Sequence, residues 1–596
     1  MKNEKTYNLV FTDIRKTLSN DINNLLLGHW CLEQNEEYLK EFRYEISEFE
    51  KKEKDNEVQY KNNLQIYEKL LDDIIINLKG VYDENWSRKS WEIFIGCWIS
   101  RYIFIIKNRY HALKYAFENY NIKQVSISDY KNFSFVTEDT VDFKLKTNND
   151  IWNFNLFSML WCEYIDPDKK VKTIEIKNEN KKIEYGKNNF KKFSFLKLLK
   201  YKIFKFFENI LCKKNRLIFY RSNFGNKFLL IKTLLKLKNF PFYYNFDSKL
   251  NNVTKLNLKR KDKFISSSDE KIHKILNDNF YNFLPTYFLE SLDELKFKFK
   301  ELLLPKIPKI VFSANPFVQD NLFKYWLAKN IMNKGKIITF QHGNNYGTTK
   351  ICPQEDIEVK LSDKFLTWGW SDKSRQNIEA FGIFKNIEKK INLVNKRKIL
   401  LIISSTYNYV TGEGTGEILS MRTKKYQKIL DELIKKMPNV ILENIFIRGN
   451  YVGEKLRSSK ITSNIKKKYK NLKFQNSKKP LINVFNDFGL ILNSNDSTVF
   501  LESMALNKPT ISLMDETLYF NHFRSEPSEI FAQLKEVGII HTNIDSLIDF
   551  LEKINFNFNE WWNTERVNKI KYLFVKNYCK PINNFPEEIN IFTKNL

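Results

Sequence analysis

Glycine, proline and cysteine are scarce in this sequence. Glycine contributes 17 of the 596 residues and proline 13, while 42% are hydrophobic, a balance that excludes a disordered low-complexity protein. The six cysteines lie far apart without a Cys-x-x-Cys pair, which argues against a zinc site and a disulfide scaffold. The sequence also lacks the apolar core of a signal peptide and any uncharged run near the ~20 residues that span a bilayer. We therefore expect a cytoplasmic globular protein that is not threaded through a membrane.

Positive charge is in excess. Lysine and arginine total 98 against 70 acidic residues, which gives a net charge of +28. Such an excess is typical of proteins that bind nucleic acid, anionic lipid or phosphorylated substrates. The abundance of Lys, Asn, Ile, Phe and Tyr has an alternative cause, an AT-rich genome, which carries no information about partners. No RNP pattern, zinc knuckle or helix-turn-helix signature accompanies the charge, so we expect no nucleic-acid partner.

The pattern of hydrophobic residues changes along the chain. Residues 34–78 and 88–119 carry apolar residues at helical spacing, so the first third is predicted to be mostly helical. From about residue 215, short apolar strands alternate with helices, which is typical of a parallel α/β sheet. The expected strands are 216–220, 309–313, 336–341, 398–404, 439–446, 488–494 and 510–514, and the expected helices are 320–333, 423–437 and 497–506.

A domain break is predicted near Gly335, because strand-helix units can close one sheet before it and about five begin after it. We expect an α/β protein of the GT-B-like kind, with two Rossmann-like domains facing a cleft and an extra helical N-terminal region. The domains would span 1–334 and 335–560, followed by a helical tail at 561–596. In open α/β sheets ligands bind beyond the carboxyl ends of the strands, so residues after each strand are the candidates for function.

The most informative strand end is the segment QHGNNYG at 341–347. Its two glycines permit close backbone approach, and His342 would point from a strand end toward the cleft. A lone histidine is more often a structural group than a catalytic one. Its position between a strand and a glycine-bearing loop favours the functional interpretation here.

A second strand end, NSNDSTVFLE at 493–502, combines a hydroxyl-rich turn with the start of a helix. Ser497 and Thr498 lie where free backbone N–H groups and the positive end of the helix dipole attract an anion such as phosphate. Glu502 lies one turn further on the same face, at a distance suited to the hydroxyls of a ribose. The alternative is that Asp496 or Ser497 only caps the helix.

Together these segments resemble a family of surface-carbohydrate or O-antigen transferases with a GT-B fold and, more distantly, the retaining Kdo transferases of bacterial capsule and lipopolysaccharide synthesis. The pairing of QHG with TWGW is the most specific part of the resemblance. The matching segments are LGHWCL at 27–32, FSAN at 312–315 with Asp320, QHGNNYG at 341–347, SDKFLTWGW at 362–370 and NSNDSTVFLESMALNKP at 493–509.

The resemblance implies a glycosyltransferase that moves a sugar, Kdo or another nonulosonic acid, from a CMP-linked donor to a glycan acceptor of a surface polysaccharide. It implies Asp320 as the nucleophile of a retaining reaction, His342 as the partner of the donor's phosphate or carboxylate, and no metal or other cofactor. Asp320 has an alternative role as the N-cap of the helix that it begins. The donor contacts would come from Gln341, Gly343, Ser494, Ser497, Thr498 and Glu502, with Arg448 and the loop 412–416 as further candidates.

Two other interpretations concern partners. Residues 190–216, which follow a polar linker, hold nine basic residues and one acidic residue among apolar ones, and this predicts an amphipathic helix on the anionic inner membrane surface. The alternative is a helix packed on the N-terminal domain with its lysines reaching solvent.

A different class of function also stays open: a catalytically inactive GT-B scaffold that binds nucleotide or glycan in a polysaccharide assembly complex.

Overall fold

In the residues that the computed structural model describes, the strands form three parallel sheets where two were expected. Every pairing between strands of these sheets is parallel, which confirms the α/β class. The structure describes residues 5–32, 39–49, 56–82, 85–176, 217–221, 227–239, 256–301, 308–315, 317, 320–331, 335–385, 391, 396–410, 421–450, 460–475 and 479–596.

The first sheet lies in the region that was predicted to be mostly helical. Its strands run in the order β3-β2-β1-β4-β5. Helices accompany it as expected, among them one continuous helix over 88–119. The strands are β1 (Thr6–Val10), β2 (Asn23–Leu26), β3 (Tyr44–Ile46), β4 (Asn121–Ser128) and β5 (Lys172–Ile176).

The second sheet continues through the predicted domain break. Its order is β10-β9-β8-β7-β6, and β7 pairs with β8 from Ile310 opposite Lys336 to Ser313 opposite Thr339. A boundary between 334 and 335 therefore falls between two paired strands of one sheet, and the prediction of a break there is wrong. The strands are β6 (Leu217–Tyr220), β7 (Ile310–Ser313), β8 (Lys336–Phe340), β9 (Lys364–Thr367) and β10 (Ile378–Ala380).

The third sheet has the order β13-β12-β11-β14-β15-β16. One predicted strand, 439–446, is half helix, because the carbonyl of Pro438 accepts hydrogen bonds from the N–H groups of Ile441 and Leu442 and starts the short helix α15. The strands are β11 (Ile399–Ile402), β12 (Ile445–Arg448), β13 (Lys473–Phe474), β14 (Leu490–Asn493), β15 (Thr510–Leu513) and β16 (Ile540–His541).

The α-helices cover the faces of these sheets and connect them. They are α3 (Asn56–Lys79), α4 (Arg88–Asn119), α5 (Thr140–Lys146), α6 (Asp150–Leu160), α8 (Lys227–Lys236), α9 (Lys271–Phe283), α10 (Leu292–Glu301), α12 (Asn321–Ile331), α13 (Pro353–Leu361), α14 (Met421–Lys436), α15 (Asn439–Leu442), α17 (Ile461–Lys468), α18 (Thr498–Ala505), α19 (Ser525–Glu536), α20 (Ile544–Ile554), α21 (Phe558–Trp562), α22 (Glu565–Tyr578) and α23 (Phe585–Lys594).

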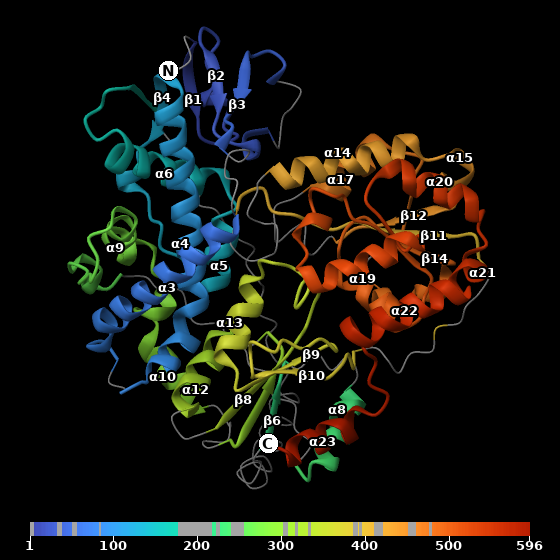
Figure 1. The fold of residues 1–596 in the computed structure, drawn as a ribbon. Helices are drawn as coiled ribbons and strands as arrows, with labels where there is room; N and C mark the ends of the chain where they lie inside the picture. Colours follow the sequence, from blue (N-terminus) through green and yellow to red (C-terminus); the bar gives the residue numbers. More distant parts are fainter. Residues whose placement is uncertain are drawn as a thin grey trace, which may run out of the picture.

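The long helix α4 joins the first two sheets into one body. Figure 1 shows the first sheet at one end of the molecule, the second sheet at the other and α4 extending between them, with the third sheet beside both. The helix packs against α3, α6, α12 and α13. One continuous hydrophobic core includes Leu9 of β1, Trp98 of α4 and Trp326 of α12. The first sheet, α4 and α12 therefore share one core.

The C-terminal segment returns to the second sheet. Helix α22 packs on α18 and α19 beside the third sheet, whereas α23 packs on α8 next to the second sheet. The crossing is held where the N–H of Lys580 donates to the carbonyl of Trp368 at 2.8 Å and the N–H of Ile383 donates to Lys580 at 2.7 Å. The predicted tail 561–596 is helical, as expected, but its two ends belong to different sheets.

Two sequence predictions lie outside the described residues, namely the basic segment 190–216 and the glycine loop 412–416. No helix of the described part of the chain is both long and apolar enough to cross a membrane.

Candidate functional site

The loops at the carboxyl ends of β8 and β14 meet between the second and third sheets. The N–H of Asn344, in the QHG loop, donates to Oγ1 of Thr498 at 3.2 Å, and that hydroxyl donates to Asn344 Oδ1 at 3.1 Å. The Asn344 side-chain amide also donates to the carbonyl of Asp496 at 3.2 Å. A Cβ on Gly343 would lie 3.4 Å from Thr498 Oγ1, so the backbone comes close to the start of α18 there. The two strongest sequence motifs thus form one site.

Gln341 holds the QHG loop to the TWGW segment after β9. Its Oε1 accepts from the Trp368 N–H at 2.9 Å and from the Trp370 indole at 2.8 Å, while its amide donates to the Gly343 carbonyl at 2.8 Å. These contacts use most of the hydrogen-bonding capacity of the buried side chain. They give a physical reason for the pairing of QHG with TWGW in the sequence, and they make Gln341 a residue that shapes the loop.

Gly347 ends the loop in a conformation that favours glycine. Its φ is +71°, and a Cβ there would lie 2.3 Å from the Trp370 ring, so any larger residue would clash. The glycine therefore allows the loop to turn tightly against the indole.

His342 lies in a buried polar network at the end of β8. Gln354 Nε2 lies 3.2 Å from His342 Nε2, and the Tyr346 hydroxyl lies 3.2 Å from His342 Nδ1 and donates to Glu358 Oε2 at 3.0 Å. An amide donor at Nε2 favours the tautomer with the proton on Nδ1. The His342 Nδ1–H then donates to the Tyr346 hydroxyl, which in turn donates to the carboxyl group of Glu358.

Burial keeps both ends of this network uncharged near neutral pH. It lowers the pKa of His342 to about 4, with the nearby Lys385 ammonium as a smaller cause, and it raises the pKa of Glu358 to about 8. Although Nδ1 and Oε2 are 3.7 Å apart, the two groups are therefore not an ion pair at pH 7. The sequence analysis expected His342 to be the partner of a phosphate or carboxylate. A neutral imidazole can exchange hydrogen bonds with such a group, but it cannot balance its charge.

A positive charge near this site comes from Lys385, which the sequence analysis missed. Its ammonium lies 2.6 Å from Glu502 Oε1, and Glu502 is mostly buried on α18. The Lys385 charge also contributes to the lowered pKa of His342. No motif marks this lysine, since it comes near the site only through contacts between distant parts of the chain.

Three other predicted donor contacts have structural partners. The Ser497 hydroxyl accepts from the Phe500 N–H at 3.3 Å, so it caps α18 as the alternative interpretation proposed. Ser494 Oγ donates to the Ile402 carbonyl at 2.7 Å inside the third sheet. Arg448 donates to Gln475 Oε1 and the Lys479 carbonyl, both at 2.6 Å.

Asp320 is buried at the start of α12. Its Oδ1 accepts from the Phe323 N–H at 3.0 Å, which is the N-cap contact of the alternative interpretation. Its Oδ2 accepts from the Tyr220 hydroxyl and lies 3.6 Å from Arg221 Nη2. The sequence interpretation of Asp320 as a nucleophile places its side chain at an open cleft. In the structure this side chain is buried, with 1% exposed.

Asp166 and Asp168 form an Asp-x-Asp pair, a spacing that could suit a metal ion. The Asp166 carboxylate accepts from the N–H groups of Lys170 and Val171, both at 2.9 Å, and so closes a turn. Asp168 pairs with Lys170 at the surface. Within the described ranges, no group of three or more His, Cys, Asp or Glu residues is arranged to hold a metal.

The loop after β11 connects the third sheet to the first. The N–H groups of Asn408 and Tyr409 donate to Asn148 Oδ1 at 3.1 and 3.2 Å, and the Tyr409 ring lies 5.5 Å from the ring of Trp30. Arg109 of α4 donates to the Val410 carbonyl at 2.8 Å. Strand-end loops of the third sheet therefore reach both of the other sheets.

Three parallel sheets with a buried polar site between the second and third define an α/β protein whose candidate site is assembled from distant strand ends. The chain belongs to the LIC12162 family of transferases, whose family model matches residues 7–591. No match was found among curated proteins.

Several solved structures are distantly similar. The spinosyn rhamnosyltransferase SpnG with spinosyn aglycone has 9% identity and a TM-score of 0.30, covering 52% of this chain and 78% of its own. MurG of Acinetobacter baumannii has 9% identity and a TM-score of 0.30, covering 64% and 100%. The wall teichoic acid polymerase TagF has 12% identity and a TM-score of 0.33, covering 67% and 95%.

Proposed function

We propose that the protein is a glycosyltransferase of the GT-B type that binds a nucleotide sugar where the QHG loop meets α18. The observation that carries this proposal is the contact of Asn344 with Thr498, which brings a glycine-bearing loop to the N-terminus of a helix. Backbone N–H groups at such an end attract phosphate. The transferase family to which the chain belongs supports a group-transfer reaction.

The pair of Lys385 and Glu502 fits a nucleotide in two ways. The Glu502 carboxylate can accept hydrogen bonds from ribose hydroxyls, as the sequence analysis proposed, and the Lys385 ammonium can pair with the phosphate. In the structure the Lys385 ammonium and the Glu502 carboxylate pair with each other at 2.6 Å. Donor binding would exchange this internal ion pair for two contacts with the ligand, which favours a ligand that carries both hydroxyl groups and negative charge.

For the donor we propose a CMP-linked 2-keto acid sugar, Kdo or another nonulosonic acid, and for the acceptor a glycan of a bacterial surface polysaccharide. His342, as a neutral imidazole, would orient the donor by hydrogen bonding. Asp320 is the proposed nucleophile of a retaining, metal-independent transfer, since Tyr220 and Arg221 are donors suited to a carboxylate. This role requires that donor binding uncover Oδ2.

Calorimetry with a panel of sugar nucleotides tests the proposal, together with release of nucleotide in the presence of glycan acceptors. We expect Lys385→Met to weaken donor binding by about 1–3 kcal/mol, the usual range for loss of a charged partner. Lys364→Met is a matched control, because the two lysines have exposed fractions of 35% and 34% and each pairs with a glutamate.

The proposal is wrong if no sugar nucleotide binds, or if the Lys385 and Lys364 variants behave alike. Tight donor binding without nucleotide release for any acceptor would instead support the inactive scaffold.

A further inference from the structure

Helix α8 has apolar residues on two opposite faces. Leu230, Thr233 and Leu234 are buried against the second sheet. Phe228, Ile231 and Leu235, spaced by three and four residues, form a second stripe on the outside of the helix. A surface helix of a globular protein normally has one apolar face, so the outer stripe needs another explanation.

The outer stripe is open to solvent. Phe228 is 74% exposed, Leu235 is 60% exposed and Ile231 is 42% exposed. Helix α23, which packs on α8 (Figure 1), carries a further exposed apolar side chain, Ile591, at 49% exposed. Exposed apolar residues gathered on one helix face, as on α8, are typical of an interaction surface.

Lysines surround the stripe. Lys227, Lys232, Lys236 and Lys238 are all exposed on α8 or immediately after it, and α8 contains no acidic residue. Lys236 pairs with Glu587 of α23 at 2.7 Å, so its charge is partly balanced. The remaining charges leave the apolar stripe beside a positive rim, a combination typical of helices that lie in the interface of an anionic bilayer.

We infer that the outer face of α8, together with Ile591 of α23, docks on an anionic lipid surface. Phe228, Ile231 and Leu235 would enter the boundary between headgroups and acyl chains, and the lysines would contact the anionic headgroups. A second copy of the chain fits this face less well, since a symmetric contact would bring two sets of lysines together. The inference is independent of the proposed donor site and of the segment 190–216.

Co-sedimentation with vesicles tests this inference. The vesicles are phosphatidylcholine alone and an equimolar mixture with phosphatidylglycerol. We expect the full chain to bind the anionic vesicles, and the triple variant Phe228→Ser, Ile231→Ser, Leu235→Ser to bind roughly tenfold more weakly. Leu258→Ser with Val440→Ser is the matched control, because these side chains are 72% and 65% exposed elsewhere on the surface.

A charge variant separates the two parts of the surface. Lys227→Glu with Lys232→Glu should weaken binding to anionic vesicles and leave any weak binding to neutral vesicles unchanged, and high salt should act in the same direction. The melting temperature and donor binding of each variant show that the fold and the candidate site are intact.

Several results would overturn the inference. They are equal binding of the wild-type chain to both vesicles, binding to neither, or unchanged binding of the triple variant. A wild-type dimer in solution that the triple variant converts to a monomer, without vesicle binding, would assign the face to a second copy instead.

Discussion

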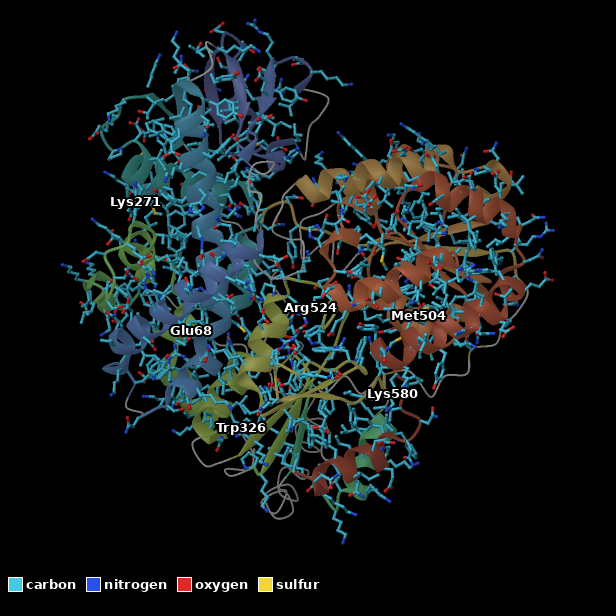
Figure 2. All side chains as sticks on the ribbon, in the orientation of Figure 1. Glu68, Lys271, Trp326, Met504, Arg524 and Lys580 are labelled. Carbon is cyan, nitrogen blue, oxygen red and sulfur yellow. The ribbon has the colours of Figure 1, made fainter. Side chains whose placement is uncertain are left out.

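Glu355 of α13 and Arg524, the residue before α19, form an ion pair with 2.9 Å between Oε1 and Nη2. The pair crosses from the second sheet to the third, and Figure 2 shows Arg524 between α13 and α19. The same carboxylate accepts from the Gly347 N–H at 2.6 Å and pairs with Arg375 at 2.5 Å. One buried carboxylate therefore fixes the end of the QHG loop and joins two sheets.

We expect Glu355→Gln to loosen this junction, because it leaves two arginines without their shared counter-ion. Stability should fall by about 1–3 kcal/mol. Amide hydrogen exchange should become faster at Arg524 and Lys350, whose N–H groups bond across the junction to Thr348 and His522. Arg375→Gln is the control, since it keeps the contact between Glu355 and Arg524. Equal exchange in the two variants would contradict this role.

Asp320→Asn distinguishes a helix cap from a nucleophile. Asparagine caps helices about as well as aspartate, so the variant should fold, with stability lowered only by its weaker contacts with Tyr220 and Arg221. We expect transfer to fall by several orders of magnitude, because an amide cannot form the glycosyl-enzyme bond. Tyr220→Phe, which removes a donor to the same carboxylate, should lower transfer much less. Near-normal turnover of the asparagine variant would leave Asp320 with the cap alone.

Glu358 should make the protein less stable as the pH rises. Its folded pKa is raised to about 8 by burial, so the folded state holds a proton that the unfolded state loses near pH 4.5. Its contribution to stability is complete below about pH 4.5 and is lost as the pH rises through 8. Glu358→Gln should flatten the dependence between these values, measured by urea denaturation at several pH values. An unchanged slope would show that Glu358 is ionised in the folded chain.

Lys324 of α12 is a buried charge whose removal should stabilise the protein. Its ammonium has no hydrogen-bond partner among the described atoms, and burial lowers its pKa to about 8. The cost of burying the charge is present below pH 8 and is relieved as the pH rises toward 10.5. We expect Lys324→Met to raise stability by about 1–3 kcal/mol at pH 7 and less at pH 10. Lys329→Met, on the same helix but partly exposed, should have little effect in thermal denaturation.

Much of the second and third sheets could be predicted because their strands are short, uninterrupted apolar runs. The first sheet was missed for a physical reason. Its inner strands carry Asn8 and Asn24, both fully buried, and the Asn8 amide donates to Asn24 Oδ1 at 2.8 Å across the sheet. Other partners complete the hydrogen bonding of both side chains, since Gln124 donates to Asn8 Oδ1 and the Asn24 amide donates to the Ser19 carbonyl. In the sequence, however, each asparagine interrupts the apolar pattern.

The site was predictable where one segment carried several signals, as QHGNNYG and NSNDST do. The meeting of Asn344 with Thr498 follows from the general position of ligands at strand ends. Lys385 could not be found in this way, because its importance depends on Glu502 more than a hundred residues later. For Asp320 the sequence offered the helix cap as an alternative role, which the structure shows, but its motif did not reveal the contact with Tyr220, a residue one hundred positions earlier.

The single helix α4 has a consequence for synthesis of the protein. Its partner α12 begins at Asn321, about 200 residues after α4 ends at Asn119. At ribosomal rates of about 5–20 residues per second, α12 is synthesised about 10–40 s after α4. During that time Trp98 and its neighbours have only the first sheet and nearby helices to cover them. Until the second sheet leaves the ribosome, the nascent chain therefore exposes hydrophobic surface that can bind chaperones or other nascent chains.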